Sequence, residues 1–186
     1  MMLKNLRISL VLLVLCGLIY PLTMTGLAQA IMPNQAEGSL ITDPSGKVIG
    51  SELIGQSFSD PKYFTGRISS INNNAAGSGS NNYAPSNTAL KERVEKDIAA
   101  FLAANPGVKK EDIPADLLTN SASGLDPDIS VQAAKIQVAR IAQARGLEPK
   151  KLEQLIAEQT EGPSLGLFGE SRVNVLKLNL ALDQLR

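Results

Sequence analysis

Residues 8–32 read ISLVLLVLCGLIYPLTMTGLAQAIM, an uncharged stretch that begins after Arg7 and is followed by no charge before Glu37. As an α-helix rising about 1.5 Å per residue, it would be roughly 37 Å long, enough to cross a hydrocarbon core of about 30 Å with some tilt. Pro21 would bend this helix rather than break it, because a nearby threonine or a neighbouring helix can satisfy the freed backbone group. We therefore predict one membrane-spanning helix here.

The same stretch also has the features of a cleaved secretory signal. Lys4 and Arg7 form a basic start, residues 8–20 form an apolar middle, and Ala28-Gln29-Ala30 has the small-x-small form of a cleavage site. In both interpretations the two cations keep the N-terminus in the cytoplasm. We therefore expect three regions, namely a cytoplasmic N-terminus at 1–7, a transmembrane helix at 8–32 and an extracytoplasmic domain at 33–186.

The composition of the chain argues against several classes of function. Eighteen basic and eighteen acidic residues give a net charge of zero, whereas a nucleic-acid-binding domain needs a basic face. The sequence contains no histidine, and its one cysteine, Cys16, lies in the apolar stretch. The usual zinc and copper ligands and the imidazole base of a catalytic triad are therefore missing. We expect no metal site, no catalytic residue and no enzymatic activity in this chain.

The exported region alternates short apolar pieces with helical patterns. Residues 38–41 and 47–50 flank the turn sequence Asp43-Pro44-Ser45-Gly46 and predict a β-hairpin, and residues 53–58 predict a further strand. Residues 72–87 are rich in Asn, Gly and Ser and predict a loop.

Helical spacing begins after Asn87 and stops at Asn105. A second helix is predicted from Ser130, as its cap, to Arg145, followed by Gly146. A third begins at Pro149. Residues 173–185 fit both a strand and a helix period, and we favour a helix for the later part because its residues are helix formers. The predicted fold is α+β, with one N-terminal transmembrane helix and a small extracytoplasmic domain of few strands and three or four helices.

Several polar residues are candidates for a functional or partner-contact patch. Hydroxyls and a glycine leading into a helix can bind an anion through free N–H groups, but the same residues can simply satisfy turn and cap donors, with the arginines paired to nearby acids. Likewise, the aromatic pair before Arg67 is typical of a packing wedge. The candidates are Arg67, Ser121, Ser123, Gly124, Asp126, Gln137, Arg140, Asn179 and Asp183.

Over nearly the whole chain, a series of short strings resembles one family, the C subunit of the Kdp-type potassium-transporting ATPase. The most specific are Ser-Ala-Ser-Gly-Leu-Asp at 121–126 and Leu-Asn-Leu-Ala-Leu-Asp at 178–183. The others are Tyr20-Pro21-Leu22, residues 38–41, 50–51 and 53–58, Tyr63-Phe64 with Arg67, residues 129–130 and 133–134, and residues 173–176.

The resemblance implies a single-pass accessory subunit of a high-affinity, ATP-driven potassium uptake pump in the bacterial inner membrane, with its anchor uncleaved. Its implied partners are a channel-like potassium-binding subunit and a P-type ATP-hydrolysing subunit, with a small membrane subunit as a further candidate. The family is described as a catalytic chaperone that raises the ATP affinity of the hydrolysing subunit. Because ATP is cytoplasmic and the domain is expected outside, we expect no tightly bound cofactor and an indirect effect on ATP through the complex.

One alternative remains open at this stage. The chain could be a secreted or membrane-tethered module that binds a small ligand through the loop at 72–87. The mature N-terminus distinguishes the two, because loss of residues 1–30 favours the free module and an intact start favours the anchored subunit.

Overall fold

The computed structural model describes residues 2–43 and 45–185, so Pro44 of the predicted turn lies outside the described residues. Contacts within the chain divide it into two compact units, Met1–Ser51 and Glu52–Arg186. Helices and short antiparallel sheets occur together, which confirms the predicted α+β class.

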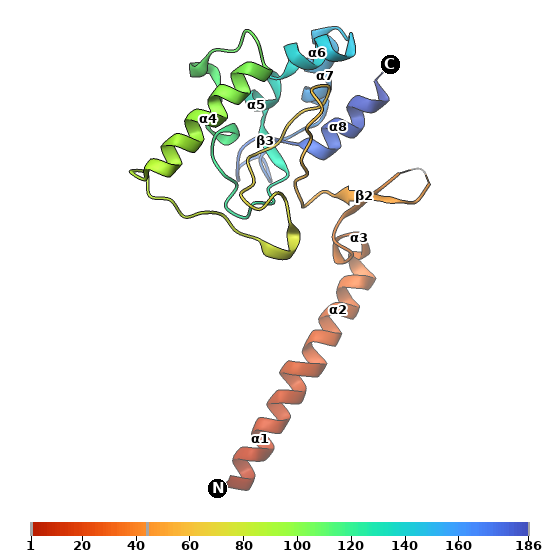
Figure 1. Cartoon of the computed structure of the whole chain (residues 1–186). Helices are drawn as coiled ribbons and strands as arrows, with labels where there is room; N and C mark the ends of the chain where they lie inside the picture. The colour runs from red at the N-terminus through yellow and green to blue at the C-terminus, as the bar shows by residue number, and fades with distance from the viewer. Residues whose placement is uncertain (1, 44, 186) are drawn as a thin grey trace. The chain divides into compact units, whose positions relative to one another are not determined.

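The N-terminal unit begins with one uninterrupted helix (Figure 1), made of α1 (Met2–Val14), a π-helical turn (Leu15–Ile19) and α2 (Tyr20–Ile31). It starts before the predicted Ile8 and so includes both cations. The whole helix, with a mean hydropathy of 2.2 in its apolar window, is long and apolar enough to cross a membrane.

The π turn lies directly before Pro21. In this turn the Tyr20 N–H donates to the carbonyl of Leu15, five residues back instead of four. Proline has no N–H to continue the four-residue pattern, and a π turn is one of the local adjustments that accommodates the change. The prediction that Pro21 does not break the helix is therefore confirmed.

After a short helix, α3 (Pro33–Ala36), the predicted hairpin is present. Strands β1 (Leu40–Thr42) and β2 (Val48–Ser51) pair antiparallel with an irregularity between Ile41 and Thr42. The Asp43 carboxylate accepts hydrogen bonds from the backbone N–H groups of Ser45 and Lys47. The hydrogen bond from the Ser45 hydroxyl to the same carboxylate, together with these backbone bonds, lowers the pKa of Asp43.

The C-terminal unit is built on a three-stranded antiparallel sheet in the order β3–β5–β4. Its strands are β3 (Asp128–Ser130), β5 (Arg172–Asn174) and β4 (Thr160–Glu161). Two strands run directly into helices, because their last residue is also a helix cap. Ser130 accepts from the N–H of Ala133 at the start of α5 (Val131–Lys135), and Asn174 accepts from the N–H of Lys177 at the start of α8 (Val175–Gln184).

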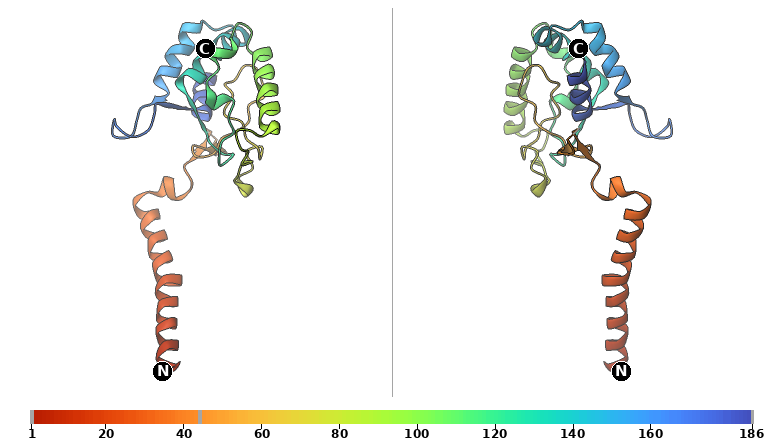
Figure 2. Two further views of the ribbon diagram at one scale, coloured as in Figure 1. Left: turned by 90° about the vertical axis from the view of Figure 1, so that its left-hand side faces the viewer. Right: turned by 90° about the vertical axis from the view of Figure 1, so that its right-hand side faces the viewer.

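Three further helices complete this unit, α4 (Thr88–Ala104), α6 (Val138–Arg145) and α7 (Pro149–Glu158). Figure 2 shows α4 on one side of the unit and α6 and α7 on the other. The Asn87 side chain caps α4, Gly146 ends α6 in the left-handed conformation at φ +65°, and Pro149 begins α7, as the sequence predicted. Single 3₁₀ turns occupy Ala75–Gly77, Lys110–Asp112 and Ala115–Leu117.

Two predictions about elements are wrong. Residues 53–58 form no strand, because their backbone follows the turn at 121–126 instead, with the N–H of Gly55 donating to the carbonyl of Leu125. The helix expected from Ser130 to Arg145 is divided into α5 and α6 at Ile136 and Gln137. The sequence around Val173 was ambiguous, and the structure divides it between β5 and α8.

One hydrophobic core fills the C-terminal unit between the sheet and the helices. Small alanines of α5 let this helix pack closely, while α7 and α8 contribute leucines. Its fully buried members with at most 2% exposure are Phe64, Ile129, Ala133, Ala134, Ile141, Leu152, Ile156, Val173, Leu178 and Leu182. Phe64 is the member that comes from outside the helices and strands, and its segment carries the candidate site.

Candidate functional site

The segment Pro61–Arg67, called here the clamped segment, passes through the C-terminal unit without joining a sheet. A buried backbone must have its N–H and C=O groups paired. In this segment the partners are mainly side chains from elements far away in the sequence, which is the feature that brings the predicted site residues together.

Asn179 of α8 binds the centre of the clamped segment. Its Oδ1 accepts from the Phe64 N–H and its Nδ2 donates to the Phe64 carbonyl, both at 2.9 Å. Phe64 is 0% exposed and Asn179 is 1% exposed. One amide side chain thus supplies the two hydrogen bonds that a neighbouring strand would give, while the phenyl ring enters the core.

Gln137 performs the same role for the next residue. Its Oε1 accepts from the backbone N–H and the hydroxyl of Thr65, each at 2.9 Å, and its Nε2 donates to the Thr65 carbonyl at 3.1 Å. Nε2 also donates to the Ala133 carbonyl. Gln137 stands in the break between α5 and α6, so this break places the amide against the clamped segment.

Arg140 binds the start of the clamped segment. Its Nη1 donates to the carbonyls of Pro61 and Tyr63, its Nε to Asn105 Oδ1 at 2.9 Å, and its Nη2 to Gln137 Oε1 at 2.7 Å. Within residues 2–43 and 45–185 no carboxylate forms an ion pair with it, which corrects the expectation that Arg140 pairs with an acid. Burial lowers the pKa of Arg140. Its charge is balanced by the oxygen dipoles of carbonyls and amides.

Arg145 and Asp183 hold Tyr63. The guanidinium of Arg145 lies 4.8 Å from the centre of the Tyr63 ring and forms an ion pair of 2.6 Å with Asp183. The Tyr63 hydroxyl donates to the other carboxylate oxygen of Asp183 at 3.0 Å, and Arg145 Nε donates to the Lys62 carbonyl. For Arg145, the predicted pairing with an acid is confirmed.

At the far end of the segment, Arg67 binds the turn at 121–126. Its Nη1 forms an ion pair of 2.8 Å with Asp126, and its Nη2 donates to the Asn120 carbonyl. Within the turn, Ser121 Oγ accepts from the Asp126 N–H and Ser123 Oγ accepts from the Leu125 N–H. The turn leads into β3 and not into a helix, so the geometry expected for anion binding is not formed, and the hydroxyls satisfy turn donors.

Gly124 sits at the closest approach in this region. Its φ is +70°, and a Cβ atom here would lie 2.5 Å from Ile71 Cγ1 and 2.8 Å from the Gly79 carbonyl oxygen. Gly79 in turn donates its N–H to the Ser123 carbonyl. The glycine therefore lets the loop at 72–87 pack on the turn.

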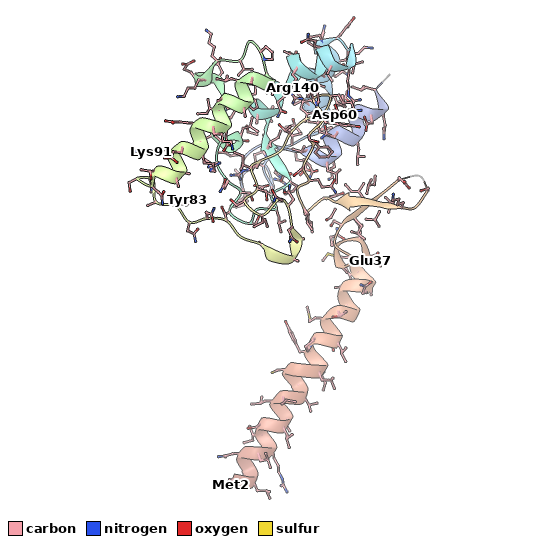
Figure 3. All side chains as sticks on the ribbon, viewed as in Figure 1. Met2, Glu37, Asp60, Tyr83, Lys91 and Arg140 are labelled. Carbon is pink, nitrogen blue, oxygen red and sulfur yellow. The ribbon has the colours of Figure 1, made fainter. Side chains whose placement is uncertain are left out.

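A pocket of about 300 Å³ lies between the clamped segment and α4. Its lining includes the apolar side chains of Phe101 and Leu117 and the charged side chains of Asp60 and Arg140, and the last two are labelled in Figure 3. Among the described residues no group of three or more His, Cys, Asp or Glu side chains could hold a metal ion.

A second pocket is lined by charged residues of β3 and β5. It contains Asp128, whose pKa is raised by burial and by the neighbouring Asp126, although Arg172 lies 3.1 Å away. Nearby, Lys177 pairs with Glu52 and Glu161, and the hydrogen bond to Glu52 raises its pKa. These charges are mutually paired around the sheet, which is typical of a structural ion-pair network.

The structure thus places all nine predicted residues on or next to the clamped segment and the turn it binds. Gln137, Arg140, Asn179 and Asp183 bind the segment between Pro61 and Thr65. The second contact is formed by Arg67 with the turn that contains Ser121, Ser123, Gly124 and Asp126. The roles of Asn105 and Thr65 were not predicted from the sequence, because the hydrogen bonds that define them join residues 35 and 72 positions apart. A sequence pattern of fixed spacing cannot reveal such pairs.

Comparison with known proteins adds the following findings. The family model KdpC, described as K+-transporting ATPase, c chain, matches residues 2–184. A protein of Bacillus cereus strain B4264 named potassium-transporting ATPase KdpC subunit is 61% identical over 179 residues, covering 96% of this chain and 93% of its own length. A protein of the same name from Bacillus anthracis is 58% identical over the same shares.

Proposed function

Because this chain belongs to the KdpC family, we propose that it is the accessory, non-catalytic subunit of a potassium-transporting ATPase, held in the membrane by the helix Met2–Ile31. The relatives that have the name of this pump subunit match the chain over nearly their whole length. The helix gives the chain the anchor that such a subunit needs.

The non-catalytic role is supported by what the strongest candidate groups do. Arg140, Gln137 and Asn179 have their hydrogen-bonding groups engaged with backbone and with each other. A catalytic group must reach a substrate, whereas these side chains hold the clamped segment. We therefore assign the C-terminal unit to assembly and conformational support of the pump.

The orientation is part of the proposal. Lys4 and Arg7 precede the apolar part of the helix, and cations flanking a span favour the cytoplasmic side. The C-terminal unit would then be extracytoplasmic, on the bacterial inner membrane. Its partners would be the channel-like potassium-binding subunit and the ATP-hydrolysing subunit, with a small membrane subunit as a third.

An extracytoplasmic unit cannot touch cytoplasmic ATP, so an effect on ATP affinity would be indirect. A subunit that binds one conformation of the pump more tightly shifts the population toward it, and the coupling is reciprocal. If that conformation binds ATP more tightly, the KM for ATP falls when this chain is present. No cofactor is needed in this chain itself.

The deciding experiment is purification of the intact, tagged chain from detergent-solubilised membranes of cells that express the whole pump. The potassium-binding and ATP-hydrolysing subunits should copurify with it, and photoreactive ATP should label the hydrolysing subunit but not this chain. A chain that elutes alone and trimmed after Ala30 would overturn the assignment and favour the secreted module.

A further inference from the structure

The connection between β4 and β5 ends in an exposed apolar tip, Ser164–Phe168. The exposed fractions are 89% for Leu165, 82% for Leu167 and 65% for Phe168. Figure 2 shows this connection projecting away from the helices of the C-terminal unit. Single exposed apolar residues are normal, but three on one small loop mark an interaction surface.

The tip is a defined structure and not an open loop. The N–H of Ser164 donates to the Phe168 carbonyl at 2.8 Å, the N–H of Phe168 donates back to the Ser164 carbonyl at 3.0 Å, and the N–H of Gly166 donates to the Pro163 carbonyl. These bonds close the loop on itself. The apolar side chains are consequently presented outward from a fixed backbone, which reduces the entropy that binding would cost.

Leu165 has a backbone conformation that leucine disfavours. Its φ is +55°, in the left-handed region that is unfavourable for a residue with a Cβ and that Asn or Gly adopts more readily. A leucine that is 89% exposed gains little within its own chain to offset this cost. A leucine that keeps this unfavourable backbone conformation while almost fully exposed is consistent with a contact outside the chain.

The size of the tip limits the kind of partner. Three such side chains bury on the order of 400 Å², against roughly 800 Å² on each side of a stable complex between freely diffusing proteins. A small contact becomes effective when the two partners are already held close together. A partner in the same membrane satisfies this condition, because the chain has its own anchor helix.

The charges around the tip favour a protein over lipid. Residues 160–171 contain Glu161 and Glu170 and no Lys or Arg. Segments that insert into anionic bilayer surfaces are rich in Lys and Arg, because those cations are attracted to the headgroups. Glu161 is paired with Arg172 and Lys177, whereas Glu170 forms no ion pair within the described residues. The negative charge of Glu170 beside the apolar tip is complementary to an apolar pocket with a basic rim.

We propose that Leu165, Leu167 and Phe168 insert into an apolar, basic-rimmed pocket on the extracytoplasmic face of a membrane-embedded subunit of the pump. This proposal rests on the proposed function, since it takes the partner from the same complex. The partner contact is thus assigned to a loop outside the clamped segment. The polar groups of the clamped segment are already hydrogen-bonded within the chain.

The proposal is tested with a photoreactive benzoylphenylalanine in place of Phe168, in the full chain and in membranes that hold the whole pump. Irradiation should join this chain to a pump subunit identified by mass spectrometry. Crosslinking to lipid or to a second copy of the chain, or no crosslinking at all, would overturn the proposal.

A second measurement uses the triple variant Leu165→Asn, Leu167→Ser and Phe168→Ser. Asn tolerates the positive φ, so the fold should be retained, and the recovery of copurified subunits should fall about tenfold or more. The matched controls are Leu167→Met with Phe168→Met, which keep an apolar tip, and Val48→Ser, which removes an exposed apolar side chain elsewhere. Both controls should bind like the wild type.

The outcomes separate the two proposals. If the wild-type chain copurifies with the pump subunits and the triple variant does so equally well, the tip has no docking role but the assignment as a pump subunit stands. If the wild-type chain does not copurify with them, the assignment itself fails.

Discussion

Asn179 and Gln137 take the place of a strand beside the clamped segment. Each side-chain amide offers one donor and one acceptor, as a peptide group does, and each pairs with both backbone groups of one residue, Phe64 or Thr65. Removing such an amide leaves two buried backbone groups without partners. The cost is then set by desolvation rather than by the modest net gain of a hydrogen bond.

We predict that Asn179→Leu lowers the free energy of unfolding by about 2–4 kcal/mol. Leucine has a similar volume, so the loss comes from the unpaired N–H and carbonyl of Phe64. Chemical denaturation of the full chain in detergent measures it. The control is Asn82→Leu in the exposed loop, for which the change should stay within about 0.5 kcal/mol. Equal effects of the two substitutions would contradict the clamp.

Asp128 gives a prediction about pH. Its pKa is raised above 3.8 in the fold, mainly by burial and then by Asp126. The native state therefore holds this proton to a higher pH than the unfolded chain, so stability falls as the pH rises from about 3.8 through the raised pKa. Asp128→Asn should accordingly stabilise the chain at pH 7, and the gain should disappear toward pH 3.

Asp60 is the matched control with the opposite sign. Hydrogen bonds from Lys62 lower its pKa, so Asp60→Asn should give no stabilisation at pH 7. Thermal unfolding of the three proteins at several pH values measures both effects. A pH-independent gain for Asp128→Asn would mean that packing, and not ionisation, causes it.

At the scale of the elements, the junctions between strands and helices position the residues of the candidate site. Two strands of only three residues lead directly into capped helices, β3 into α5 and β5 into α8. The break between α5 and α6 is another such junction, since it places the Gln137 amide against Thr65. The turn at 121–126 places Asp126 against Arg67 in the same way.

We predict that Gly124→Ala destabilises the chain by about 2–4 kcal/mol, through the left-handed backbone and through the clash with Ile71 and Gly79. Gly146→Ala is the matched control, because Gly146 has a similar φ of +65° but nothing within 4 Å of a Cβ. It should cost only about 1–2 kcal/mol. Similar costs for both would show that the close packing at Gly124 contributes nothing.

The elements were predictable from the sequence where local rules decide them. Asn87, Gly146 and Pro149 mark helix ends by capping and backbone geometry, and the apolar run before Pro21 indicates its helix by composition alone. The strands β3 and β4 were missed, since two or three residues are too few to show a period of two. The hydrogen bonds that hold the clamped segment were missed because they join residues up to 120 positions apart.

The tip at 164–168 was also missed, although a signal was present. Residues 162–169 carry no charge and contain three large apolar residues among glycines, without the period of either a helix or a strand. Such a pattern is typical neither of a core element, which would show a helix or strand period, nor of an ordinary polar surface loop. Only its exposure in the fold makes it a candidate for a contact.

At the scale of the whole molecule, we propose an anchored subunit whose C-terminal unit faces outward. The helix Met2–Ile31 is long and apolar enough to be the anchor, and Lys4 and Arg7 favour a cytoplasmic N-terminus. The side chains that looked most functional in the sequence hold the fold together, and the contact with the pump is assigned to the tip.

Cysteine labelling tests this account most directly. In a Cys16→Ser background, a cysteine at Ser80 in the loop of the C-terminal unit should react with a membrane-impermeant maleimide added to intact spheroplasts, on a chain whose mass shows that residues 1–30 are retained. Reaction only after the membrane is permeabilised, or a chain that has lost its first 30 residues, would contradict the anchored, outward-facing subunit.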